Sequence, residues 1–226
     1  CDIGKGAPQH NVDKFKKFLD VAFSLNNCLV SVRNDGSLAN IERLLGNRYS
    51  NYICKIPDGG FFIQPNHYMH PEIINGNYIL INLAGDMILQ RFPKQKYNSI
   101  NYEEFKVEMV KIIKVIVENF NLAIVFAPHI YKDLSIIADI LESLPDWIRR
   151  QWVTVTPYLT GFKGQDYIFD VYRNAQLVLG NRFHANVCSI GLARPSIGLS
   201  NYPKVQAVYN ELNMSTRCIE INKQGF

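Results

Sequence analysis

Leu179-Gly180-Asn181-Arg182-Phe183-His184-Ala185 joins the end of an apolar strand to the beginning of a helix. The apolar run 177–179 stops at Gly180, and Arg182 and His184 stand where the next helix is expected to open. Backbone N–H groups point outward at a helix N-terminus and carry a partial positive charge, so a cation and an imidazole placed there favour an anionic ligand. The stretch therefore predicts a strand–turn–helix unit with an anion site at its turn.

The same alternation of apolar runs and amphipathic stretches continues on both sides of this turn. We expect strands at 78–83, 122–127, 152–155, 177–179, 196–199 and 217–220, and helices at 102–120, 134–144, 167–174, 185–190 and 204–212. Continuously apolar strands that alternate with helices are typical of a parallel sheet whose two faces are both covered. The sequence therefore predicts an α/β fold with a Rossmann-like parallel sheet and helices on both faces. In such sheets ligands bind beyond the carboxyl ends of the strands.

The first 65 residues predict a smaller α/β piece. Helices are expected at 13–24 and 37–45, and strands at 28–32 and 52–56. Two strands are too few for an independent sheet, so we interpret 1–65 as a partial N-terminal domain, 66–76 as a polar linker and 77–226 as a C-terminal domain. Because the chain begins with Cys1 instead of Met, we expect a fragment or a processed piece.

Composition narrows the function classes. The 226 residues are 47% hydrophobic and 19% charged, with a net charge of +4, as in an ordinary globular protein. The sequence has no run of Lys and Arg of the kind that binds nucleic acids, so we expect no nucleic-acid partner. It also has no apolar run as long as a membrane span. The five cysteines are widely spaced, which argues against a zinc site and a disulfide framework and favours reduced thiols in the cytoplasm. We therefore expect no metal site.

Four further strand ends carry candidate residues. Arg33 closes an apolar strand, where an unpaired charge would be costly, so we expect it to face a cleft as an anion ligand. Ser37 is the expected N-cap of the helix that follows. Asp58 lies in a turn, and His129 and Lys204 follow strands of the predicted parallel sheet. An ordinary turn also accounts for Asp58, and a solvated lysine for Lys204, so both alternatives stay open.

Several of these residues form a recognisable pattern. Gly180, Arg182, His184, Gly191 and Pro195 resemble the signature of the polysaccharide pyruvyltransferase family, with Ser189 in place of an alanine. The segment 32–37 is similar to the family's Val-Arg-Asp-x-x-Ser motif, although Asn34 stands where an aspartate is common. Three further segments resemble family motifs. Asp58 lies in an Asp-Gly-Gly-Phe segment, and His129 is followed four residues later by an aspartate. Lys204 matches the lysine of a turn that occurs in the family.

The resemblance implies an activity and an architecture. Family members transfer pyruvate from phosphoenolpyruvate to hydroxyls of a polysaccharide or glycan precursor as a ketal, in exopolysaccharide and cell-surface glycan biosynthesis. Two Rossmann-like domains face each other across a cleft, as in glycosyltransferase-B folds, and this chain would hold about half of that architecture. Phosphoenolpyruvate is the donor substrate, no cofactor is implied, and the partners are the donor, a saccharide acceptor and, peripherally, a lipid-linked glycan.

The resemblance also assigns roles. It implies His184, His129 and Asp58 as catalytic residues, and Arg182, Arg33, Lys204 and Ser37 as substrate-binding residues. Two other functions stay open at this point. One is a nucleotide-sugar-dependent glycosyltransferase of similar two-domain fold, and the other is a non-catalytic binding module.

Overall fold

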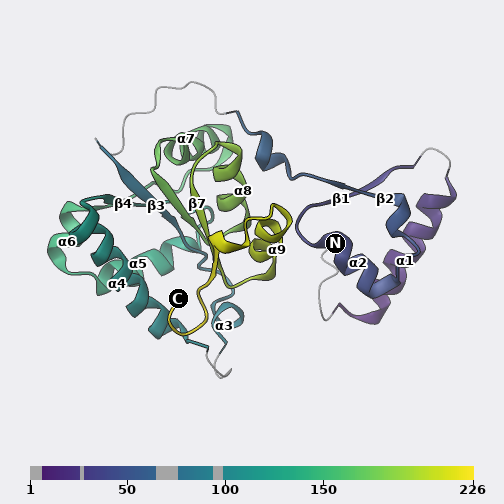
Figure 1. The fold of residues 1–226 in the computed structure, drawn as a ribbon, viewed down its shortest axis with the longest axis horizontal. Helices are drawn as coiled ribbons and strands as arrows, with labels where there is room; N and C mark the ends of the chain where they lie inside the picture. Colours follow the sequence, from purple (N-terminus) through teal and green to yellow (C-terminus); the bar gives the residue numbers. More distant parts are fainter. Residues whose placement is uncertain (1–6, 26–27, 65–75, 94–98) are drawn as a thin grey trace. The chain divides into compact units, whose positions relative to one another are not determined.

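The computed structural model describes residues 7–25, 28–64, 76–93 and 99–226. Contacts between residues divide the chain into two compact units, Cys1–Asp58 and Gly59–Phe226 (Figure 1). Apart from Gly76, the predicted linker at 66–76 lies outside the described residues. The predicted domain limits therefore stay a prediction.

A six-stranded parallel sheet forms the centre of the second unit. Its strands are β3 (Tyr78–Asn82), β4 (Ala123–Phe126), β5 (Val153–Val155), β6 (Leu177–Gly180), β7 (Ser196–Ser200) and β8 (Cys218–Glu220). The strand order is β5-β4-β3-β6-β7-β8, and every neighbouring pair runs parallel. This is the order of a Rossmann sheet, in which the winding direction reverses between the two central strands, here β3 and β6. The predicted parallel sheet is confirmed.

Helices cover both faces of this sheet, as predicted (Figure 1). The helices of the second unit are α3 (Ile88–Arg91), α4 (Tyr102–Phe120), α5 (Asp133–Ser143), α6 (Asp146–Gln151), α7 (Gly161–Asn174), α8 (Phe183–Gly191) and α9 (Pro203–Glu211). Two short 3₁₀ helices accompany them, η2 (Gly59–Phe62) and η3 (Ser215–Arg217). Among the described residues, no helix is long and apolar enough to cross a bilayer.

The central strand β3 shows why its residues 78–81 are all apolar. Successive side chains of a strand point to opposite faces of the sheet. In β3, Ile79 and Ile81 pack into the cluster built with α4, α5 and α6. Tyr78 and Leu80 instead join the cluster that contains Tyr172 of α7. Both faces of the strand are therefore buried, which excludes an alternating polar pattern.

The structure begins two of the predicted helices earlier than expected and adds two short helices. The helix expected at 167 begins at Gly161, and α6 and the short α3 were not predicted. Glycines are poor helix formers, and Gly161 and Gly164 hide the first turns of α7 from a periodicity analysis. The helix expected at 13 begins at Gln9.

The first unit is a small α/β piece. It consists of α1 (Gln9–Ser24), β1 (Val30–Arg33), α2 (Ser37–Leu45), the 3₁₀ helix η1 (Ser50–Tyr52) and β2 (Ile53–Ile56). β1 and β2 pair in parallel, and the core contains Leu19, Ile41, Tyr49 and Ile53.

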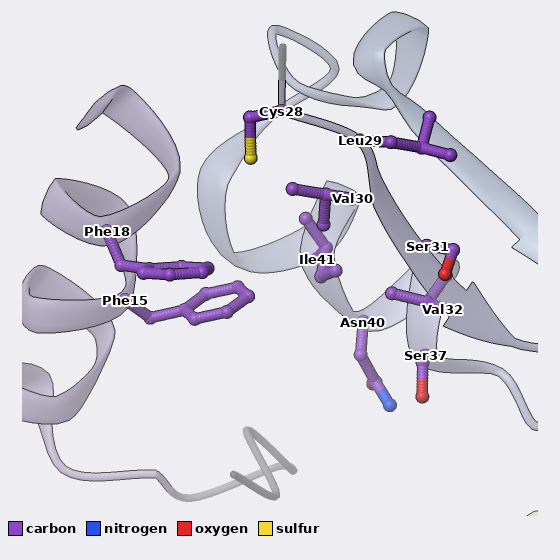
Figure 2. Close-up of a pocket in the computed structure, with 10 residues that line it drawn as sticks. All are labelled: Phe15, Phe18, Cys28, Leu29, Val30, Ser31, Val32, Ser37, Asn40 and Ile41. Carbon is purple, nitrogen blue, oxygen red and sulfur yellow. The ribbon is translucent and has the colours of Figure 1, made fainter. Parts of the chain in front are cut away.

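A cavity of about 490 Å³ lies in the first unit between α1 and the β1–α2 segment. Figure 2 shows Phe15 and Phe18 reaching from α1 toward Val30 and Ile41. The two phenyl rings stack with their centroids 6.1 Å apart. Apolar and polar groups share the wall, and the side chains of Ser31, Ser37 and Asn40 are among the polar ones.

Candidate functional site

The residues that follow β3, β4 and β6 are tied together where the winding of the sheet reverses. Asn82, the last residue of β3, is fully buried. Its Nδ2 donates to the Ala127 carbonyl oxygen after β4 (2.8 Å), and its Oδ1 accepts from the Arg182 N–H after β6 (3.0 Å). This amide fixes three adjacent strand ends at the carboxyl edge of the sheet, the place where ligands bind in this kind of fold.

Arg182 is held by two carboxylates at this edge. Its Nε donates to Asp133 Oδ2 (2.8 Å), and its Nη2 donates to Asp133 Oδ1 and to Asp86 Oδ1 (2.7 Å). The guanidinium therefore binds Asp133 in the bidentate geometry that suits a carboxylate. Nη1 of Arg182 has no hydrogen-bond partner among the described residues. One donor of the fork thus remains for an external anion, and the role of Arg182 as a substrate ligand stays a prediction.

Asp133 is the anchor of this arrangement. The side chain is fully buried and also accepts from the backbone N–H groups of Gly85 (3.0 Å), His129 (2.9 Å) and Ile130 (3.1 Å). Burial raises the pKa of Asp133, but the hydrogen bonds and charge of Arg182 and the backbone donors outweigh it, so the pKa lies below its usual value. Asp133 is therefore a carboxylate at neutral pH.

Gly85 makes the approach of these two loops feasible. A Cβ atom at this position would lie 2.0 Å from the carbonyl oxygen of Lys132, which is well inside van der Waals contact. Only glycine allows the loop after β3 to approach the loop after β4 this closely. The sequence signal for this approach is the Gly85-Asp86 pair shortly after a buried strand, and neither residue was among the predicted site residues.

A second buried arginine extends the network to β7. Arg91 donates through Nε to the Asp86 carbonyl oxygen (2.9 Å) and through Nη1 to Asn201 Oδ1 (3.0 Å). Asn201 Oδ1 also accepts from Asn181 Nδ2 (2.9 Å). Burial lowers the pKa of Arg91, and the neighbouring Asp86 opposes this. The two arginines, Arg91 and Arg182, and the two aspartates, Asp86 and Asp133, make this hydrogen-bonded cluster formally neutral. We call this cluster the floor of the candidate site.

Positive potential at the edge comes from the two helices next to this floor. α8 and α9 begin directly after the adjacent strands β6 and β7, and neither has a side-chain hydrogen bond at its N-cap. His184 lies in the first turn of α8 and Lys204 in the first turn of α9. The structure therefore brings Arg182, His184 and Lys204 to one edge of the sheet, at two helix N-termini that favour an anion.

His129 follows β4 at the same edge of the sheet. Its ring Nε2 is hydrogen-bonded to the Tyr172 hydroxyl at 2.7 Å. Burial lowers the pKa of His129 to about 4; Asp133 opposes this shift, and the charges of Arg182 and His184 reinforce it. The imidazole is therefore uncharged at neutral pH, and protonated His129 is not available there as an acid.

The depressed pKa of His129 predicts a pH-dependent stability. Below its ordinary pKa of 6.5 the unfolded state binds a proton that the folded state excludes until about pH 4. The free energy of unfolding should therefore fall between pH 6.5 and pH 4, by about 3 kcal/mol. Denaturant titrations at several pH values measure this loss.

His129→Gln serves as the matched variant, because an amide accepts from Tyr172 without titrating. This variant should lose most of the slope between pH 6.5 and 4 and should keep the later loss, near and below pH 4, that reprotonation of Asp133 causes. An unchanged slope in His129→Gln would contradict the assignment.

Arg33 lies in the first unit and is also paired. Its Nη2 lies 2.9 Å from Asp35 Oδ2 and its Nη1 lies 2.8 Å from Asp58 Oδ2, and both carboxylates are buried. The Asp58 N–H donates to Asn34 Oδ1 at 3.1 Å. These contacts account for a charge at the end of β1 without a ligand. Substrate binding by Arg33 and catalysis by Asp58 stay predictions.

The predicted N-cap at Ser37 is wrong. Ser37 is the first residue of α2, and the capping position is Gly36, whose φ of 84° suits glycine. The Asp35 carboxylate accepts from the Ser37 N–H at 3.2 Å and from the Ser37 hydroxyl. Asp35 therefore satisfies the helix start, and the proposed contact of Ser37 with a substrate stays a prediction.

The Asp58 turn leads into a short 3₁₀ helix of the second unit. Asp58 is the last residue of the first unit, and the following η2 is a 3₁₀ helix of the second unit. Within that unit Phe61 packs against the cluster of Val187, Val205, Val208 and Tyr209.

Within the described ranges, no group of three or more His, Cys, Asp or Glu residues could hold a metal ion.

Comparison with known proteins assigns the chain to a protein family. A family model described as polysaccharide pyruvyl transferase matches residues 4–202. No curated protein matches the chain. Among solved structures, the Methanocaldococcus jannaschii UDP-GlcNAc 2-epimerase in complex with UDP-GlcNAc and UDP is similar at 14% identity and a TM-score of 0.39, over 66% of this chain and 40% of that one. The Escherichia coli heptosyltransferase WaaC with ADP is similar at 14% identity and a TM-score of 0.38, over 89% of this chain and 77% of that one.

The chain thus spans 40% of the length of the epimerase, and likeness at this level carries no argument about activity. The family match is different, because it covers most of both units. It includes Arg33 and Asp58 in the first unit and Arg182 and His184 in the second. The chain belongs to the polysaccharide pyruvyl transferase family.

Proposed function

We propose that the protein transfers a pyruvyl group from phosphoenolpyruvate to hydroxyls of a polysaccharide or glycan precursor and so forms a ketal. The observation that carries this proposal is the pair of neighbouring helix N-termini with His184 and Lys204 in their first turns. Family membership supports a transferase that acts on polysaccharides. The enzyme needs no cofactor beyond its donor substrate and acts in the cytoplasm, where phosphoenolpyruvate is made.

The donor has two anionic groups that suit this edge. Its carboxylate and its phosphate each need hydrogen-bond donors, and the N–H groups that open α8 and α9 supply two sets of them. Lys204 adds a charge beside one set, and Nη1 of Arg182 adds a directed donor beside the other. Because the Arg–Asp cluster below is neutral, it positions these groups without competing for the anion.

The reaction can be balanced with the residues at hand. The methylene carbon of the enol gains a proton and becomes a methyl group, which leaves an oxocarbenium-like centre at the next carbon. One acceptor hydroxyl attacks that carbon and loses its proton, and phosphate leaves with the bridging oxygen. A second hydroxyl then closes the ketal, and its proton goes to the phosphate or to solvent.

His184 is the residue that we assign to proton transfer. It is exposed at the start of α8, whereas His129 is uncharged and bound to Tyr172. In this proposal His129 acts as a neutral hydrogen-bonding group. Asp58 is the proposed base for the acceptor hydroxyl, and Arg33 and Ser37 are proposed contacts of the substrates; all three lie in the first unit. The protein associates peripherally with the lipid carrier of the glycan when the acceptor is lipid-linked.

His184→Gln tests the proposal directly. Glutamine keeps a polar side chain at the start of α8 but cannot transfer a proton. Phosphoenolpyruvate affinity should stay within a few-fold, while turnover should fall by roughly 10²- to 10⁴-fold, the usual contribution of a general acid–base. Calorimetry of donor binding and the rate of phosphate release with an acceptor glycan measure the two quantities.

His10→Gln is the matched control, because His10 is exposed on α1 of the first unit. It should leave both quantities unchanged. Wild-type turnover in His184→Gln would remove this residue from catalysis.

A further inference from the structure

Two loops at the carboxyl edge of the second unit expose large apolar side chains, and one side chain of each loop contacts the other. One loop follows β4 and the other follows β5 and leads into α7. The exposed side chains of these loops are Ile130 (36%), Tyr131 (72%), Tyr158 (36%) and Leu159 (49%), and Phe162 (88%) follows in the first turn of α7. Single exposed apolar residues are normal, but a contiguous group of them marks a binding surface.

The two tyrosines are in direct contact. Their ring centroids lie 6.3 Å apart with an angle of 64° between the ring planes. This is an edge-to-face arrangement of the kind that aromatic pairs prefer. Because β4 and β5 are paired neighbours, the contact joins the two loops. We call the Tyr131–Tyr158 pair the aromatic platform.

The platform is rigidly connected to the candidate site. Tyr131 lies in a tight turn in which the Asp133 N–H donates to the Ile130 carbonyl oxygen (2.9 Å) and the Leu134 N–H donates to that of Tyr131 (3.2 Å). The Asp133 carboxylate closes the same turn by accepting from the Ile130 N–H (3.1 Å). That carboxylate also holds Arg182. The backbone that presents Tyr131 is therefore fixed by the ion pair that orients the proposed donor ligand.

The chemistry of the platform suits a sugar ring. One face of a pyranose carries several C–H groups in a row, and its edges carry hydroxyls. A tyrosine offers an apolar face for the C–H groups and a hydroxyl for the edge, and it has few rotatable bonds to immobilise.

We propose that the aromatic platform binds a sugar ring of the saccharide acceptor by stacking it against Tyr131. The proposal rests on the proposed function and deepens it, because it places the acceptor on the second unit, next to the donor edge. Family membership supplies the class of ligand, and the ion pair of Asp133 with Arg182 links the Tyr131 turn to the donor edge.

The test compares three variants of the full-length protein: Tyr131→Ala, Tyr131→Phe and Phe120→Ala. Phe120 is 64% exposed and ends α4 just before β4 begins, so it matches Tyr131 in exposure at the opposite edge of the sheet. The probes are methyl β-galactoside and methyl β-glucoside, titrated with saturation-transfer NMR, and uridine as a competing planar ligand. Phosphoenolpyruvate affinity is measured separately by calorimetry.

Tyr131→Ala should weaken binding of the preferred glycoside by about 3- to 10-fold, the effect of losing one aromatic contact. Tyr131→Phe should stay within about 2-fold, because the ring is kept, and Phe120→Ala should match the wild type. Donor affinity should not change in any variant.

Several results would overturn the platform. These are the absence of glycoside binding to the wild type, equal binding to wild type and Tyr131→Ala, or a Tyr131-dependent site for uridine alone. Failure of the proposed function has a different signature, because a wild type that ignores phosphoenolpyruvate but binds glycosides through Tyr131 would keep the platform and reject the donor.

Discussion

Asp133→Ala is expected to lower the free energy of unfolding of the second unit by about 3–5 kcal/mol. Removal of one partner from a buried ion pair leaves the other charge uncompensated, and this typically costs that much. Here Arg182 would lose two hydrogen bonds, and the N–H groups of Gly85, His129 and Ile130 would lose their acceptor. Thermal and denaturant unfolding measure the loss.

The control for this prediction is Asp146→Ala. Asp146 also pairs with arginines, Arg149 and Arg150, but it lies exposed at the start of α6. Exposed ion pairs contribute little to stability, so the variant should unfold nearly as the wild type does. Similar stabilities of Asp133→Ala and Asp146→Ala would show that the buried cluster does not hold the edge of the sheet.

Arg182→Lys is expected to weaken phosphoenolpyruvate binding by roughly 10- to 150-fold. An ammonium group can hold Asp133 through one contact, but it cannot hold the carboxylate bidentately and present a third nitrogen to the donor. Loss of one charge-assisted hydrogen bond costs about 1.5–3 kcal/mol. Lysine is preferable to alanine here, because it keeps a positive charge beside buried Asp133 and limits the loss of stability.

Arg194→Lys is the matched control for Arg182→Lys. Arg194 precedes β7, at the amino end of the strand, and is thus remote from the carboxyl edge. Its replacement should leave donor affinity unchanged. Wild-type affinity in a folded Arg182→Lys protein would remove Arg182 from the donor site.

The fold of the second unit could be read from the sequence because its strands are apolar on both faces. Ile79 and Leu80 point to opposite helical layers, so neither could be polar. The hydrophobic periodicity missed helical segments of this unit for two reasons, glycines at the start of a helix and the shortness of a helix. Gly161 and Gly164 conceal the start of α7, and α6 is too short to show a period.

The candidate site could be predicted only in part. Arg182, His184, His129 and Lys204 were expected at one edge because each follows a parallel strand, and the structure places them there. What each residue binds could not be predicted, because partners far apart in sequence leave no local pattern.

Two examples show this limit. Arg182 and Asp133 are 49 residues apart, and Arg91 and Asn201 are 110 residues apart. The capping error at Ser37 has the same origin on a smaller scale. Composition showed a good capping residue, but the left-handed conformation of Gly36 moves the helix start by one position.

Titration of the full-length wild-type protein with phosphoenolpyruvate, in parallel with uridine and cytidine sugar nucleotides, tests the central claim most directly. Calorimetry should show saturable binding of phosphoenolpyruvate and none of the sugar nucleotides. The reason is that the edge offers two helix N-termini, Lys204 and one donor of Arg182 for a small ligand with two anionic groups. Saturable binding of a sugar nucleotide with no response to phosphoenolpyruvate would contradict the account and favour a glycosyltransferase.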